Sequence, residues 1–256
     1  MTFFQAFILG IVQGLTEFLP VSSSGHLVVL PKIFGWGEQP LVFDTTMHLA
    51  TALALIVYFR KDLFLIVKSF DKGLFTTKTR FAWILVAGTI PAGILGVVFG
   101  DVIESAFRSV ESVVVFLTLG SLLMLAAEMF GRKKSADIDF KKGVITGFFQ
   151  ALALFPGVSR SGSTISGGMF LGLDRVAAAR FSFFLSIPII LAAGVFQLFD
   201  SSITELNPLV LLTGFISAFG SGLLAISFLL RFVRSNPLYV FVAYRVVLAI
   251  LLVFSA

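Results

Sequence analysis

A polar sequence occurs twice in this strongly apolar chain, and the repeat limits the folds open to it more than any other feature. One copy reads QGLTEFLPVSSSGH over residues 13–26, and the other reads QALALFPGVSRSGS over residues 150–163. The copies align without a gap, so we expect two copies of one structural unit. The first copy carries Glu17 and His26, whereas the second carries Arg160. A complete set of chemical groups therefore requires both copies.

Composition predicts an all-α polytopic membrane protein. Hydrophobic residues make up 57% of the 256 residues and charged residues only 13%. Cysteine is absent, which excludes disulfides and thiol chemistry. The net charge of +5 falls mostly in a few loops between apolar runs, so we expect no nucleic-acid partner. Six of these runs approach the roughly 20 residues that a helix needs to cross a bilayer. They cover residues 41–60, 81–100, 111–130, 175–199, 207–230 and 237–255.

Two further segments, 2–35 and 142–173, do not fit the pattern of full spans. Each contains an apolar stretch, a break rich in Pro, Gly and Ser, and a second, shorter apolar stretch. Irregular backbone at membrane depth is tolerated only where it is buried in protein or lines a cavity. An ordinary loop between two full spans is the alternative, but the second stretches, 28–34 and 165–173, are too short to cross. We therefore predict two re-entrant helical hairpins.

The charges in the loops predict an orientation. With both hairpins re-entrant, one face receives loops rich in Lys and Arg, and the other receives mainly acidic loops. The basic face is then cytoplasmic and both termini lie outside. Three spans separate the hairpins, so they enter from opposite faces and their tips meet near the midplane. We predict one membrane domain, 1–256, built from inverted repeats at about 1–130 and 138–256. The basic loops are 60–80, 131–142 and 231–236, and the others are 32–40, 101–110 and 200–206.

An acidic residue stands out within the first hairpin. Gln13 and Glu17 are four residues apart and share one helix face. A charged side chain at the bilayer centre costs about 2.5–3.5 kcal/mol on insertion scales, so it is normally paired or functional. One interpretation of Glu17 is a purely structural ion pair with Arg160. The other is an active site in which Glu17 holds Mg²⁺ or Ca²⁺ together with substrate phosphates.

The residues around the two breaks favour an anionic, phosphorylated ligand. The serines from Ser22 to Ser24 begin a half-helix, whose N-terminus attracts anions. The guanidinium of Arg160 is a planar fork suited to phosphate. Either Ser23 attacks with His26 as its base, or His26 attacks itself, and both alternatives stay open. The substrate-binding candidates are Ser22, Ser24, Ser159, Ser161, Ser163 and Thr164.

Taken together, these motifs resemble the undecaprenyl-diphosphate phosphatase family, also called the bacitracin-resistance proteins. The resemblance rests on the Gln-x-x-x-Glu box at residues 13–17 and on PGVSRSGST at 156–164, and it covers essentially the whole chain. It implies a plasma-membrane enzyme that removes one phosphate from a long-chain isoprenoid diphosphate and needs a divalent cation. The site of such an enzyme would open to the outer face.

By resemblance, Glu17 is the metal-linked acid, Ser23 or His26 is the nucleophile, and Arg160 binds phosphate. Many family members have a glutamate where this chain has Gln13, and an amide oxygen is the weaker metal ligand. The first position of the metal box is thus altered here.

Two other functions would also fit parts of this sequence pattern. A transporter or flippase of a lipid phosphate would also use inverted repeats, and a non-catalytic lipid-binding membrane protein would share the composition. The expected partners are the isoprenoid diphosphate and membrane lipids, with a homodimer as one arrangement of the chain. Asp44 and His48 share a face of the 41–60 span, and we predict a packing or hydrogen-bonded pair there rather than a ligand set.

Overall fold

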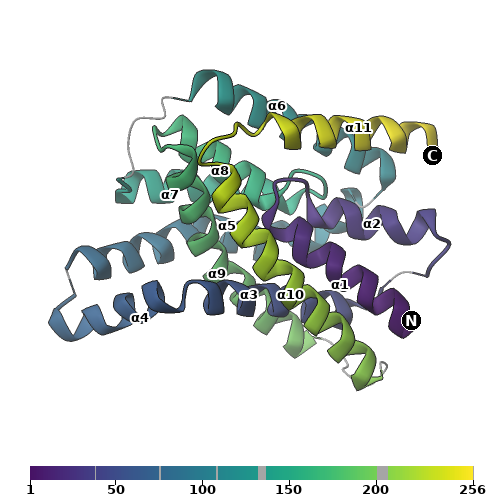
Figure 1. The fold of residues 1–256 in the computed structure, drawn as a ribbon, viewed down its shortest axis with the longest axis horizontal. Coiled ribbons are helices and arrows are strands. Elements are labelled where there is room, and N and C mark those ends of the chain that lie inside the picture. The colour runs from purple at the N-terminus through teal and green to yellow at the C-terminus, as the bar shows by residue number, and fades with distance from the viewer. Residues whose placement is uncertain (38, 75, 108, 132–136, 201–206, 256) are drawn as a thin grey trace.

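The computed structural model describes residues 1–37, 39–74, 76–107, 109–131, 137–200 and 207–255, and within these ranges it contains helices and no strand. Figure 1 shows the helices joined by short connections. In chain order they are α1 (Phe3–Phe18), α2 (Ser23–Ile33), α3 (Leu41–Tyr58), α4 (Arg60–Ser69), η1 (Phe70–Lys72), α5 (Thr77–Phe107), α6 (Val110–Phe130), α7 (Phe140–Ala151), η2 (Leu152–Leu154), α8 (Arg160–Phe170), α9 (Arg175–Asp200), α10 (Pro208–Phe232) and α11 (Tyr239–Ser255).

The long helices confirm a polytopic membrane protein. Five of the six predicted runs form helices that are long and apolar enough to cross a bilayer, namely α3, α5, α6, α9 and α10. The sixth run, 237–255, forms α11, an apolar helix of 17 residues that is shorter than these five. The outward side chains along the long helices are mostly large and apolar, which suits contact with lipid.

Both polar repeats form helical hairpins, α1 with α2 and α7 with α8. The second hairpin begins and ends on one side of the bundle. Phe140 at the start of α7 lines a pocket with Arg80 near the start of α5. Arg175 at the start of α9 is paired with Glu128 near the end of α6, at 2.6 Å. Since α5 and α6 are consecutive spans, the start of one and the end of the other lie on the same side. The hairpin is therefore re-entrant, as predicted.

The breaks in the two hairpins have the same backbone conformation at aligned positions. Ser22 and Ser159 are the N-caps of α2 and α8, and both have a φ of 76°. In the part of the chain that the structure describes, they are the only residues other than glycine with positive φ. Each cap hydroxyl accepts the N–H three residues ahead, from Gly25 or Gly162, at 3.2 Å. A left-handed serine is costly, so its occurrence at both positions indicates a duplicated and tightly constrained turn.

Close contact between helices of different repeats holds the hairpins in place. A side chain at Gly10 of α1 would collide with the carbonyl of Gly214 in α10, and one at Gly147 of α7 would collide with the carbonyl of Gly88 in α5. Gly10 and Gly147 occupy aligned positions. Small residues let helix backbones approach closely where no hydrophobic effect drives packing in lipid. Each hairpin thus packs on a long helix of the other half of the chain.

A continuous apolar core lies directly beneath the hairpin tips. Phe18, the residue after Glu17, is fully buried and meets Phe183 of α9 edge to face, with ring centroids 5.5 Å apart. Met124 of α6 and Ile165 of α8 belong to the same buried cluster. The core therefore fixes the end of α1 against α9, and with it the position of Glu17.

Candidate active site

The tips of the two hairpins meet, as the inverted-repeat prediction requires. The Ser161 hydroxyl of the second tip donates to the Leu19 carbonyl of the first at 3.1 Å. In the other direction, the Gly157 N–H lies 3.5 Å from the Ser24 Oγ, a long contact. Ser24 and Ser161 are aligned residues, so the same position of each repeat reaches across to the other. The tips form one structural unit.

Glu17 lies at the centre of this unit and binds groups from both repeats. Its Oε1 accepts a hydrogen bond from the Nη2 of Arg160 at 2.8 Å. Its Oε2 accepts from the Ser23 hydroxyl at 2.8 Å and from the Nε2 of Gln13 at 3.1 Å. The glutamate is 7% exposed, so these bonds replace most of its hydration. The nucleophile candidate Ser23 and the predicted phosphate-binding residue Arg160 therefore both contact the Glu17 carboxylate.

The structure does not form the predicted pair of Ser23 with His26. The Nδ1 of His26 lies 2.7 Å from the Ser22 carbonyl, and its Nε2 lies 2.7 Å from the hydroxyl of Tyr244 on α11. Because a carbonyl only accepts, Nδ1 carries a proton, and Nε2 is paired with the Tyr244 hydroxyl. Both ring nitrogens are thus occupied. The base within reach of the Ser23 hydroxyl in this arrangement is Glu17.

A second histidine joins the site. The Nδ1 of His48 lies 3.0 Å from the Nε2 of Gln13 and 3.6 Å from the Oε2 of Glu17. An amide nitrogen only donates, so the imidazole accepts here and fixes the orientation of the Gln13 amide. The sequence suggested a pair of His48 with Asp44, and the structure adds a position beside the Glu17 carboxylate. The signal was in the sequence, since an ionisable residue inside a span is a functional candidate by default.

Arg245 on α11 is a further residue that the sequence analysis missed. It is fully buried, and its guanidinium donates to the carbonyls of Pro20 at 3.4 Å and Gly157 at 2.9 Å. Pro20 and Gly157 are aligned residues in the tips of the two hairpins. The same side chain also donates to Ser121 and to the Leu117 carbonyl, both at 3.0 Å. Arg245 thus links both tips to α6 and sets their separation.

The hydroxyls predicted to bind substrate are mostly engaged in shaping the start of α8. Ser163 and Thr164 donate to the Arg160 carbonyl at 3.1 and 2.7 Å, and Thr164 also lies 2.6 Å from the hydroxyl of Ser182. Ser24 is exposed, and Ser23 is partly so. The hydrogen bonds from Ser163 and Thr164 hold the backbone that carries Arg160. The buried members of the predicted set are Ser22, Ser159, Ser161, Ser163 and Thr164.

Two buried polar atoms next to Glu17 have no hydrogen-bond partner among the residues that the structure describes. They are the Nη1 of Arg160 and the Oε1 of Gln13. An unsatisfied buried group is costly, so each marks a place where a ligand can bind. The guanidinium nitrogen suits a phosphate oxygen, and the amide oxygen suits a cation. Both vacant bonding positions lie in the same small region.

The residues around Glu17 fit a divalent cation only as a partial ligand set. Among the described residues, no three His, Asp or Glu side chains form a cluster that could hold a metal ion. Glu17 and the free Oε1 of Gln13 provide two oxygen donors. Mg²⁺ commonly binds through one or two carboxylates and completes its shell with water and substrate phosphates. The donor set suits an ion that arrives with a diphosphate.

Comparison with known proteins agrees with this geometry. A family model described as "Bacitracin resistance protein BacA" matches residues 6–251. A protein of Myxococcus xanthus named undecaprenyl-diphosphatase is 43% identical over 262 residues, which cover 98% of this chain and 88% of the relative. A protein of the same name from Idiomarina loihiensis is 42% identical and covers 98% of both chains. A third, from Corynebacterium striatum, is 43% identical over 98% of this chain and 93% of its own.

Proposed function

Because the chain belongs to the bacitracin resistance protein BacA family, we propose that it is an undecaprenyl-diphosphatase. It removes the terminal phosphate of the isoprenoid diphosphate and leaves the monophosphate carrier lipid, which supports cell-wall precursor recycling and bacitracin resistance. One structural observation supports this proposed function most strongly. Glu17 accepts hydrogen bonds from Ser23 of its own hairpin and from Arg160 of the other.

We propose that Ser23 carries out the first step, and its contact with Glu17 supports this role. Its Oγ attacks the terminal phosphorus, while its proton passes to the Oε2 of Glu17, 2.8 Å away. The bond from phosphorus to the bridging oxygen breaks, and the lipid monophosphate leaves with the electron pair. A general base within hydrogen-bond reach of a hydroxyl nucleophile is the arrangement that such a step needs.

The second step returns Ser23 to its starting state. A water molecule attacks the phosphoserine, inorganic phosphate leaves, and the serine oxygen regains the proton that Glu17 holds. The Nη1 of Arg160 has no partner among the described residues and can donate to the equatorial phosphoryl oxygens throughout. Phosphoryl transfer requires mainly such positioning and charge neutralisation.

We propose that Glu17 and Gln13 hold the divalent cation, Mg²⁺ or Ca²⁺, when the diphosphate binds. Bound there, the ion would neutralise charge on the phosphate oxygens. The unpartnered Oε1 of Gln13 supports this placement. The His48 ring keeps the Gln13 amide oriented with its nitrogen toward Glu17.

We also propose that the protein lies in the plasma membrane with both termini at the extracytoplasmic face and with the site opening toward that face. The contacts between loops support this orientation. The Leu238 N–H, just after loop 231–236, donates to Glu128 next to loop 131–142. Loops 60–80 and 131–142 are joined by the pocket that Arg80 and Phe140 line. The three basic loops therefore gather on one side.

The experiment that tests this function is phosphate release from undecaprenyl diphosphate by the purified protein. We expect release that depends on Mg²⁺ or Ca²⁺ and a near-complete loss in Glu17→Gln. The same proteins are also placed in liposomes, and the movement of lipid between the two leaflets is measured. Flipping without phosphate release would instead indicate a transporter and contradict the proposal.

A further inference from the structure

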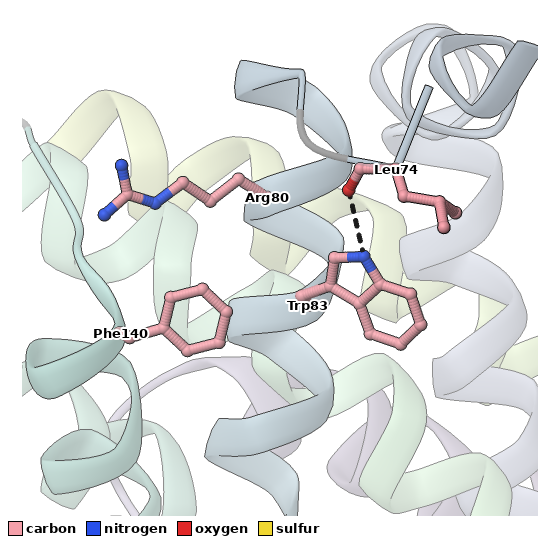
Figure 2. A pocket seen from close by; sticks show the side chains of 4 residues that line it. All are labelled: Leu74, Arg80, Trp83 and Phe140. Carbon is pink, nitrogen blue, oxygen red and sulfur yellow. Dashed lines mark hydrogen bonds between the residues drawn. The ribbon is translucent and has the colours of Figure 1, made fainter. Parts of the chain in front are cut away.

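A pocket remote from Glu17 lies where the start of α5, the turn before it and the first residue of α7 meet. It has a volume of about 510 Å³ and is lined by Leu74, Arg80, Trp83 and Phe140. Figure 2 shows Arg80 and Trp83 extending from α5, with Phe140 on the side of Arg80 and Leu74 next to Trp83. The volume is in the range of small-molecule sites, and nothing in the proposed catalytic steps uses it.

Among the residues that the structure describes, the lining combines one cation with three apolar side chains. The indole N–H of Trp83 donates to the Leu74 carbonyl at 3.3 Å, which uses its single donor and fixes the ring. Leu74, Trp83 and Phe140 are 55%, 41% and 42% exposed, so all three side chains are accessible to lipid. The guanidinium of Arg80 is exposed and has no ion pair within the part of the chain that the structure describes.

The position of the pocket relative to the membrane limits the kinds of ligand that can reach it. The spanning part of α5 begins at Thr77, so Arg80 and Trp83 lie one to two turns inside that end of the span. Tryptophan is enriched at this depth, where lipid headgroups meet hydrocarbon. The preceding loop, 60–80, holds six Lys or Arg residues and two Asp. One of these acids, Asp62, is already bound to Arg180 at 3.2 Å.

We propose that this pocket binds an anionic glycerophospholipid of the basic face. The headgroup phosphate binds the Arg80 guanidinium, and an acyl chain lies against Trp83, Leu74 and Phe140. Basic pockets between spans bind phosphorylated headgroups in this way, and the fork of Arg is suited to phosphate. A soluble anion would leave three of the four lining side chains without a partner, so a ligand with a hydrocarbon chain fits better.

The site can be tested directly because the chain has two tryptophans. Trp36→Phe leaves Trp83 as the single reporter of the pocket. The protein is placed in bilayers with a small fixed fraction of brominated lipid, either phosphatidylglycerol or phosphatidylcholine, and quenching of Trp83 is measured. We expect the anionic lipid to be enriched about fivefold at the reporter, the order expected for one basic side chain near the surface. Arg80→Gln should remove that preference, and Lys72→Gln, from the same loop but outside the lining, should keep it.

Equal quenching by the two brominated lipids, or a preference that survives Arg80→Gln, would overturn the proposal. Loss of the preference on adding millimolar inorganic phosphate would do so too, because it would indicate a site for a free anion. Native mass spectrometry of the otherwise unchanged chain gives an independent readout. It should show bound phosphatidylglycerol that Arg80→Gln loses and Lys72→Gln retains, and retention by Arg80→Gln would contradict the site.

Discussion

Arg160 and Glu17, which are 143 residues apart in the sequence, form a buried ion pair of 2.8 Å between the tips of two hairpins. The pair uses one guanidinium nitrogen and one carboxylate oxygen. The other carboxylate oxygen accepts from Ser23, and the other terminal guanidinium nitrogen has no partner among the described residues. We therefore interpret the ion pair as part of the proposed active site, where it joins the two hairpin tips. The purely structural role that the sequence left open for Glu17 would not require either of these features.

Arg160→Lys should impair turnover severely although the charge is kept. The lysine ammonium can donate to Glu17 or to a phosphoryl oxygen, but it lacks the planar guanidinium that would donate to both at once. Loss of one preorganised phosphate contact costs about 3 kcal/mol in the transition state, which corresponds to roughly a hundredfold lower kcat. Steady-state kinetics of phosphate release measure this. A kcat within a few-fold of the wild type would mean that the fork is not used.

Arg245→Lys should destabilise the protein and lower its activity together. The guanidinium bridges the Pro20 and Gly157 carbonyls, and an ammonium cannot span both and still reach Ser121. Each buried acceptor left without a donor costs about 1–3 kcal/mol. Thermal unfolding in detergent should show a clearly lower Tm. Arg231→Lys, at an exposed position on α10, is the matched control and should leave the Tm unchanged.

Gln13→Glu should keep activity and strengthen its dependence on the divalent cation. A carboxylate at this position would lie next to Glu17, and their repulsion is relieved when a cation binds between them. Titration of the metal-free protein with Mn²⁺, followed by electron paramagnetic resonance, should show tighter binding than in the wild type. Glu17→Gln should weaken it. Unchanged Mn²⁺ affinity in Gln13→Glu would place the ion away from this residue.

The proposed orientation predicts which loops face the cytoplasm. Single cysteines at Lys72 and Arg234 in this cysteine-free chain should resist an impermeant thiol reagent added to intact cells and should react after permeabilisation. Lys134, in the third basic loop, lies outside the described residues and serves as a further probe with the same expected result. Reaction of any of the three cysteines in intact cells would contradict the proposed orientation.

Local sequence patterns were sufficient to predict the hairpins and the shared site. The gapless alignment of the repeats placed Ser22 and Ser159 at equivalent positions, and both have the same left-handed backbone. The pairing of Glu17 with Arg160 followed from two opposite charges in an apolar environment. These features depend on residues within the repeats or on the cost of charge in a membrane.

The contributions of α3 and α11 could not be predicted in the same way. His48 and Tyr244 reach the site from helices outside both hairpins, and no sequence spacing indicates which helices pack together. His26 shows the consequence: helical spacing put it beside Ser23, but Tyr244 binds its ring in another direction. Arg245 was visible as a charge within an apolar run, but its hydrogen bonds to main-chain carbonyls could be found only from the fold.

The measurement that tests the central claim most directly is the identity of the phosphorylated residue during turnover. The protein is mixed with undecaprenyl diphosphate carrying a radiolabelled terminal phosphate, quenched rapidly in acid, digested and sequenced by mass spectrometry. The account predicts an acid-stable phosphoester on Ser23, absent in Ser23→Ala, which should also lose at least about a hundredfold in kcat. A phosphorylated His26 detected after an alkaline quench, or full turnover by Ser23→Ala, would contradict it.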